Sequence, residues 1–150
     1  MQITARADYA VRALAELAAR TGSATRIELA EAQDIPAKFL EAILSDLKKA
    51  GIVVALRGSG GGYVLARPAE TVSIADVVRA VDGPLAAVRG LAPEAMRYDG
   101  PAEPLRDVWV ALRASIRAVL ESVTIADLVA GRLPGEVQTL LDVDDAYRRR

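Results

Sequence analysis

The sequence predicts a mainly α-helical protein with one small β-hairpin, arranged as a winged helix-turn-helix followed by a long C-terminal helix. The first observation is the order of elements in residues 1–67, which is a long helix, a short helix, a tight turn, a second helix and a hairpin. The second is the hairpin itself, where Arg57 and a run of glycines separate two apolar segments. The third is a helical repeat of apolar residues from Leu105 to Val123.

Helix-start signals mark the first two helices. Thr4 is the expected N-cap of a helix that ends near Arg20. Thr25 and Glu28 have the spacing of a capping box, in which each side chain bonds the other residue's backbone amide. This box opens the short helix that precedes the turn.

The second helix of the pair is expected from Pro36, at its first position, to Ala50, with Gly51 ending it. Its polar residues include Lys38 and Glu41 near the start. Its apolar stripe is expected to comprise Phe39, Leu40, Ile43, Leu44 and Leu47.

Residues 52–56 and 63–65 are predicted to form the two strands of the hairpin. The tip between them has four glycines in the five residues from Gly58 to Gly62, which is more than a two-residue turn requires. One interpretation is a tip whose backbone lies against a surface, and the other is a mobile loop without a partner. A phosphate-binding loop would need a lysine, then Ser or Thr, then a helix, and a strand follows here instead.

Signals in the second half are weaker until the long helix. Ser73 and Asp76 form a second capping box, for a helix ending at Asp82. Residues 85–104 contain several prolines and are predicted to be a loop, with one helical turn around Glu94.

The helix from Leu105 to Val123 spans about five turns, longer than a small domain needs to cover itself. It is either a dimerisation helix that packs on its twin or an ordinary core helix, and its length and position favour the dimer. The candidate dimerisation residues are Leu105, Val108, Trp109, Leu112, Ile116, Val119 and Leu120.

The end of the chain is expected to hold one more short helix, from Thr124 to Gly131, and a further turn through Leu140 and Leu141. The last residues, Arg148–Arg150, are expected to form a solvated tail, with contact to DNA as the alternative.

Composition excludes several classes of function. The chain has neither cysteine nor histidine, so it lacks disulfides, thiolate metal sites and the usual general base. No constellation of other side chains suggests catalysis, so we do not expect an enzyme. No apolar run has the roughly 20 residues of a membrane span, and we expect a cytoplasmic protein.

Net charge is −1, so any basic surface must come from local placement rather than from bulk charge. The order of elements nevertheless suits DNA, because the second helix of such a pair can enter the major groove with its N-terminal residues against base edges. An arginine on the hairpin is the residue type expected in a narrow minor groove.

The residues that carry a family resemblance lie from residue 1 to about residue 130. They are Met1-Gln2-Ile3-Thr4, Asp8-Tyr9-Ala10-Val11, the unit from Ile35-Pro36 to Gly51-Ile52-Val53, the wing Arg57-Gly58-Ser59-Gly60-Gly61-Gly62-Tyr63, Ile74-Ala75-Asp76-Val77-Val78 and Val81-Asp82-Gly83. These motifs resemble the Rrf-two family of bacterial transcription regulators. The resemblance implies a homodimer that binds a palindromic operator in double-stranded DNA, with the long helix paired or exchanged between subunits.

The resemblance also implies site residues by position, with the start of the second helix in the major groove and Arg57 and Gly58 at the minor groove. Glu41 can accept from cytosine N4, and Lys38 can reach guanine or phosphate. The candidate DNA contacts are Arg6, Thr25, Pro36, Ala37, Lys38, Glu41, Arg57, Gly58, Ser59 and Gly60. For Arg6 a solvated surface charge is the alternative.

Sensor members of the family hold an iron–sulfur cluster with three cysteines in the segment that corresponds to residues 85–104. This segment has no cysteine here, so we expect no cofactor and no metal. A member without a cluster could be a constitutive repressor, could respond to a partner protein, or could bind an unidentified small molecule beside the long helix. Trp109, Met96 and Tyr98 could line its site, or could simply belong to the core.

The expected organisation is a DNA-binding unit (1–83), a loop at the sensor position (84–104), a dimerisation helix with a short helix (105–131) and a tail (132–150). The predicted function is a dimeric, sequence-specific regulator of transcription, expected to act as a repressor. The alternative is a winged-helix module for protein interaction, or a partner-controlled regulator with little DNA affinity of its own.

Overall fold

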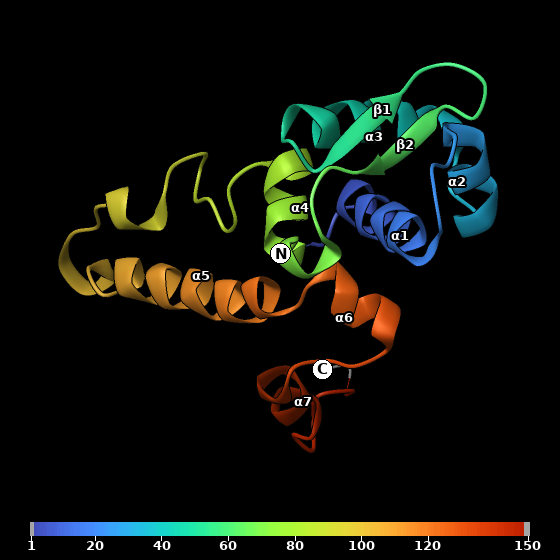
Figure 1. Ribbon diagram of the computed structural model, residues 1–150. Helices are drawn as coiled ribbons and strands as arrows, with labels where there is room; N and C mark the ends of the chain where they lie inside the picture. Colours follow the sequence, from blue (N-terminus) through green and yellow to red (C-terminus); the bar gives the residue numbers. More distant parts are fainter. Residues whose placement is uncertain (1, 149–150) are drawn as a thin grey trace.

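The computed structural model describes residues 2–148, and its first half contains the helix-turn-helix (Figure 1). Helix α1 (Ala5–Ala19) begins at Thr4, whose hydroxyl accepts a hydrogen bond from the Ala7 amide at 2.9 Å. Helix α2 (Arg26–Gln33) begins at Thr25 with both bonds of its capping box in place. Helix α3 (Ala37–Lys49) follows a short turn, so the predicted order of helices is confirmed.

The hairpin consists of β1 (Val53–Leu56) and β2 (Gly62–Leu65), paired antiparallel with Val53 opposite Leu65 and Leu56 opposite Gly62. Ala24, between α1 and α2, pairs with Tyr63 along the other edge of β2. The two bonds of this bridge, at 3.0 and 2.7 Å, attach the wing to the helical body.

One core joins the helices and the base of the wing. Its fully buried members come from α1, α2, α3, β1, α4 (Ile74–Asp82) and α6 (Ile125–Ala130). They include Leu14, Leu29, Leu40, Ile43, Leu44, Leu47, Val53, Val77 and Ile125. Burial of each such side chain contributes about 1.5–3 kcal/mol, which stabilises the position of α3 from one face.

The helix starts of α4 and α6 lie side by side. Ser73 and Thr124, their N-caps, form an antiparallel bridge in which the Ile74 amide donates to Val123 O and the Ile125 amide donates to Val72 O, both at 2.9 Å. Each N-cap also closes a capping box with its own aspartate. This junction fixes the C-terminal end of the long helix to α4 and so to the helical body that carries the wing.

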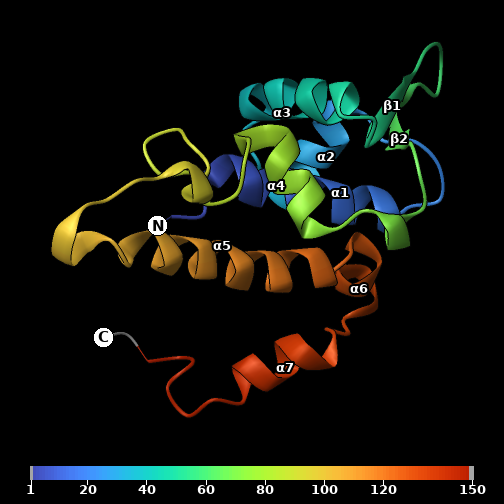
Figure 2. The ribbon, with the colours of Figure 1, turned by 90° about the vertical axis from the view of Figure 1, so that its left-hand side faces the viewer.

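Helix α5 (Leu105–Ser122) is the long helix, and it projects beyond the body in Figure 1. Figure 2 shows it running beneath α4 and α1, with α7 (Gly135–Leu141) below it. No residue of α5 is fully buried. Short 3₁₀ turns, η1 (Ala69–Thr71), η2 (Pro93–Ala95) and η3 (Gly100–Ala102), complete the described elements.

Several local predictions need correction. Pro36 is the N-cap of α3 rather than its first helical residue. Phe39 is 59% exposed, because it lies at the border of the buried stripe and not within it. The expected turn through Leu140 and Leu141 is confirmed, since both residues belong to α7, whose Val137 is buried. Arg149 and Arg150 lie outside the described residues.

Candidate nucleic-acid interface

The outer face of α3 begins at an uncapped helix N-terminus. Pro36 is exposed at the N-cap position, and no side chain caps the first turn. The partial positive charge of such an end favours a phosphate group. Ala37 is half-buried, whereas Lys38 and Glu41 are exposed. The helix is therefore anchored by its inner face and presents these polar side chains outward.

The turn before α3 sets the angle between the two helices. Asp34 adopts the left-handed conformation (φ 49°, ψ 53°), which aspartate tolerates better than most residues. Ile35 is only 4% exposed and its amide bonds to Ala30 O at 2.9 Å. Thr25 is exposed at the start of α2, and its hydroxyl is occupied by the capping box.

The wing tip carries the other predicted contacts at the surface. Arg57, Gly58, Ser59 and Gly60 are all exposed, and the tip projects beyond the helices in Figure 2. Ser23, between α1 and α2, donates its hydroxyl hydrogen to Gly60 O at 2.8 Å. Within residues 2–148 no ion pair or side-chain hydrogen bond engages the Arg57 guanidinium, which leaves it free for a ligand.

The glycine-rich tip has an internal explanation. A Cβ on Gly61 would lie 2.6 Å from Leu56 O, and one on Gly62 would lie 2.6 Å from Ala24 O. Gly58 and Gly60 have positive φ angles of 94° and 83°, which suit glycine. The number of glycines is thus accounted for within the chain, without the external surface that the sequence suggested.

Arg6 has a structural position. Its Nε donates to Val81 O at 2.9 Å, and its Nη2 pairs with Asp46 of α3. The Lys49 ammonium, at 3.0 Å, and Arg6 together hold the pKa of Asp46 below its ordinary value. Arg6 links α1, α3 and α4, so its guanidinium is already engaged and its predicted contact with DNA is not supported by this geometry.

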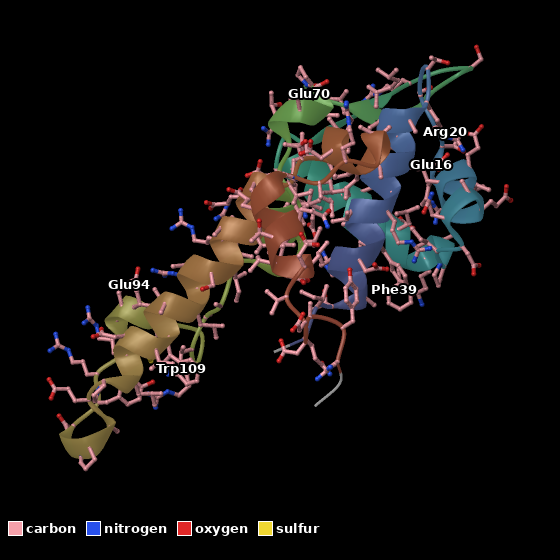
Figure 3. The ribbon with its side chains drawn as sticks, turned by 90° about the horizontal axis from the view of Figure 1, so that it is seen from below. Glu16, Arg20, Phe39, Glu70, Glu94 and Trp109 are labelled. Atoms are coloured by element: carbon pink, nitrogen blue, oxygen red, sulfur yellow. The ribbon has the colours of Figure 1, made fainter. Side chains whose placement is uncertain are left out.

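Two residues at this surface have positions that the sequence did not predict, Arg26 of α2 and Phe39 of α3. Arg26, the first residue of α2, donates from Nη1 to Ala37 O at 3.0 Å and approaches Glu41 Oε2 at 3.5 Å. Phe39 lies at the surface (Figure 3), with its ring centroid 6.3 Å from that of Tyr9 in an edge-to-face arrangement. The helical period assigned Phe39 to the core, and no local signal pairs Arg26 with a residue of the next helix.

The predicted dimerisation residues divide into two groups on α5. Leu105, Trp109, Ile116, Val119 and Leu120 are half-buried. Val108 and Leu112 are 54% and 38% exposed. Three small residues of α5, Ala111, Ala114 and Ser115, are exposed as well. This single chain therefore leaves an apolar side of α5 uncovered.

The segment before α5 folds against its outer half, where Figure 3 labels Glu94 and Trp109. Pro93 and Met96 are buried, and Arg113 Nη1 pairs with Glu94 Oε2 at 2.6 Å. The bond from Arg113 lowers the pKa of Glu94. Trp109 Nε1 donates to the Tyr98 hydroxyl at 3.1 Å. A short chain of apolar, ionic and hydrogen-bonding contacts thus holds this loop.

A family model with the name Rrf2 and the description "Iron-dependent Transcriptional regulator" matches residues 3–131 of the chain. The chain belongs to the Rrf2 family. The resemblance to the Rrf-two family is confirmed. As an Rrf2 protein with relatives named as regulators, the molecule is a DNA-binding transcriptional regulator and not an enzyme.

Relatives in the Rrf2 family match over most of the chain. A candidate HTH-type regulator of Mycobacterium tuberculosis, Rv1287, is 49% identical over 144 residues, covering 95% of this chain and 89% of its own. The regulator CymR of Bacillus subtilis is 30% identical over 132 residues, covering 87% and 91%.

Solved Rrf2 structures share the fold. The structure of B. subtilis CymR, described as the global cysteine regulator of that organism, has a TM-score of 0.74 at 28% identity and covers 87% of this chain and 98% of its own. The IscR structure from T. potens has a TM-score of 0.69 at 27% identity, covering 100% and 93%. None of the helices formed by residues 2–148 combines the length and apolarity that a membrane span requires.

Proposed function

We propose that this Rrf2 protein is a homodimeric repressor that binds a palindromic operator in the cytoplasm and carries no iron–sulfur cluster. The observation that carries the proposal is the joint exposure of the start of α3 and of Arg57 on the wing, both attached to one buried core. A rigid pair of contact elements is what sequence recognition requires, because each must reach its groove in a set position.

Two grooves would be contacted by each subunit. The outer face of α3 enters the major groove, where Lys38 and Glu41 face base edges and the uncapped end at Pro36 faces a phosphate. The wing places Arg57 in the adjacent minor groove, with Gly58, Ser59 and Gly60 along the backbone. Thr25 and Ala37 would lie at the edge of this contact, at the starts of α2 and α3.

The dimer would form through α5. Its exposed Val108 and Leu112 continue the side on which Leu105, Trp109 and Ile116 are only half-buried. A second copy of the helix would cover this apolar area, which contributes roughly 25 cal/mol per Å² removed from water. A two-fold dimer also explains a palindromic operator, since each subunit reads one half-site.

The donor atoms of this chain do not fit an iron–sulfur cluster. The sequence has no cysteine or histidine, and the 85–104 segment offers carboxylates, which are poor ligands for such a cluster. Glu94 in that segment is already paired with Arg113. In residues 2–148 no three acidic side chains gather as a metal site. The loop is held by its own contacts with α5, such as the Glu94–Arg113 pair, rather than by a cluster.

An effector would act beside α5. A hollow of about 380 Å³ is lined by Ala86, Ala87, Val88, Arg89, Trp109 and Leu112. It lies between the loop and α5, the helix that we assign to the dimer interface. A small molecule or a protein segment bound there would therefore change how the two subunits pack. Trp109 is the largest apolar side chain in this lining, whereas Met96, which is buried, and Tyr98, which is half-buried, do not belong to it.

Selection of genomic DNA fragments on the purified protein tests the proposal. We expect enrichment of fragments that share an inverted repeat, protection of both half-sites in a footprint and lower transcription of the adjacent gene when the protein is added. The protein should show no visible absorption, and its DNA affinity should not change after treatment with a chelator.

Each part of the proposal has a result that contradicts it. Enrichment of no sequence, together with stoichiometric recovery of one protein from a DNase-treated lysate, would favour the protein-interaction alternative. Raised transcription from the footprinted promoter would make the protein an activator. A visible absorption band that disappears together with DNA affinity would show that a cluster is bound after all.

A further inference from the structure

The guanidinium of Arg26 lies at the elbow between α2 and α3. Its Nη1 donates to Ala37 O at 3.0 Å, in the first turn of α3, and lies 3.5 Å from Glu41 Oε2, one turn further along. Arg26 therefore joins the first helix of the pair to the face of the second that we assign to base recognition.

Both ends of the Arg26 side chain are fixed. Its backbone follows Thr25, whose amide donates to Glu28 Oε2 at 2.7 Å and whose hydroxyl accepts from the Glu28 amide at 3.2 Å. Its guanidinium is fixed by Ala37 O, since α3 is anchored by the core. The planar fork of arginine loses little further freedom when it pairs with a carboxylate from such a position.

Glu41 by itself is poorly suited to DNA. Its side chain is 76% exposed, and an unpaired carboxylate facing a phosphate backbone is repelled. Two features allow it to work there: a cation that offsets its charge, and an anchor that aims one oxygen at a base edge. Arg26 is placed to supply both, since among residues 2–148 it is the only cation that forms an ion pair with Glu41.

We infer that Arg26 is a positioning residue for base discrimination by Glu41. Arg26 holds the carboxylate of Glu41 toward a base that presents an amino donor, such as cytosine, and reduces its repulsion from the neighbouring phosphates. The inference rests on the proposed function, because it assigns Glu41 to base recognition. It adds that the specificity of α3 depends on a residue of α2.

A double-mutant cycle tests the inference. The wild type, Arg26→Gln, Glu41→Gln and the double variant are titrated with the operator selected by the wild type and with operators changed at one base pair in each half-site. We expect Glu41→Gln to lose about tenfold of the discrimination at one base pair. Arg26→Gln should lose a similar factor at that base pair, and the double variant should lose no more than either single variant.

Other roles of Arg26 give different results. A phosphate contact would weaken binding to every sequence by the same factor and lower the salt slope by about one, which would overturn the inference. A role in folding alone would lower the melting temperature without altering base preference, which would also overturn it. Wild-type discrimination between base pairs in either single variant would overturn the inference as well. If the wild type selects no sequence, the proposed function fails first.

Two further variants complete the test. Arg79→Gln removes an arginine of α4 whose side chain is 38% exposed, close to the 37% of Arg26, and which pairs with Glu121 of α5. It should leave discrimination unchanged. If Arg26→Gln does not fold, Arg26→Lys decides, because lysine keeps the charge but lacks the fork. Lower discrimination at the Glu41 base pair supports the inference, and wild-type discrimination counts against it.

Discussion

The backbone of Gly62 passes so close to Ala24 that a Cβ on residue 62 would lie 2.6 Å from the Ala24 carbonyl oxygen. The same two segments are joined by the Ala24–Tyr63 bridge, which attaches β2 to the helical body. The wing is thus held in place by a contact that has room for glycine alone.

Gly62→Ala should therefore destabilise the wing. The added methyl group would collide with the backbone of Ala24 and Thr25, and φ at residue 62 is 145°, a conformation that residues other than glycine rarely adopt. We therefore expect a loss of about 1–3 kcal/mol in unfolding free energy. Chemical denaturation measures it. Gly135→Ala is the control, because a Cβ there meets nothing within 4 Å. Equal stability of the two variants would contradict the close approach.

Arg57→Ala should weaken DNA binding without affecting the fold. The guanidinium is exposed and has no partner in residues 2–148, so we expect an affinity loss of about 1–3 kcal/mol and a salt slope lower by about one. Fluorescence anisotropy at several salt concentrations measures both. Arg97→Ala, a change at an exposed arginine of the 85–104 segment, should bind like the wild type. Wild-type affinity for Arg57→Ala would remove the wing from the interface.

Leu112→Asp should convert the dimer into monomers. Leu112 lies on the uncovered side of α5 and is 38% exposed in the single chain, so the new charge costs little there but is buried in a dimer. Sedimentation velocity measures the change. Ile27→Asp, at a 57% exposed residue in the first turn of α2, should remain dimeric, because aspartate is tolerated at a helix start. A dimeric Leu112→Asp would place the interface elsewhere.

Stability should fall in acid through the capping boxes. The Thr124 amide, followed by its hydroxyl, lowers the pKa of Asp127 below its ordinary value of 3.8, and the same bonds from Thr25 lower that of Glu28 below 4.5. A carboxylate whose pKa is lowered by folding contributes its full stabilisation at pH values above its pKa in the unfolded chain. This contribution is lost as the pH falls through its pKa in the folded protein.

Melting temperatures between pH 7 and pH 2 measure this effect. We expect a decline that begins near pH 4.5 and steepens below about 3.8, and Asp127→Asn should flatten the lower part. Asp99→Asn, a change at an exposed aspartate whose side chain makes no capping hydrogen bond, should leave the profile unchanged. A wild-type profile in Asp127→Asn would exclude the α6 box as a source of the decline.

The elements that could be predicted are those with signals inside a few residues. Thr4, Thr25 and Ser73 each cap a helix through a bond to a residue three positions later, and so each was visible in the sequence. The 85–104 segment lacks such signals, and its contacts with α5, such as Arg113 with Glu94, join residues far apart in the chain. Its η3 turn was not predicted for the same reason.

In the candidate site, too, the residues placed correctly are those whose position follows from local spacing. Periodicity placed Lys38 and Glu41 on the outer face of α3, and the structure exposes both. Periodicity also assigned Phe39 to the core and left Arg6 open to solvent or DNA. Neither assignment could be made from local spacing, since each depends on where α1 and α4 cross α3.

The sequence by itself determined the order of helices, their caps, the wing, and the absence of thiol and imidazole ligands, because these follow from residue types and from spacing along the chain. Only the tertiary structure decided why the wing is rich in glycine, why Arg6 is engaged with Asp46 and Val81, and why Arg26 reaches Glu41. Those relationships arise where separate helices and strands pack together, and the distances between their side chains are set by the core.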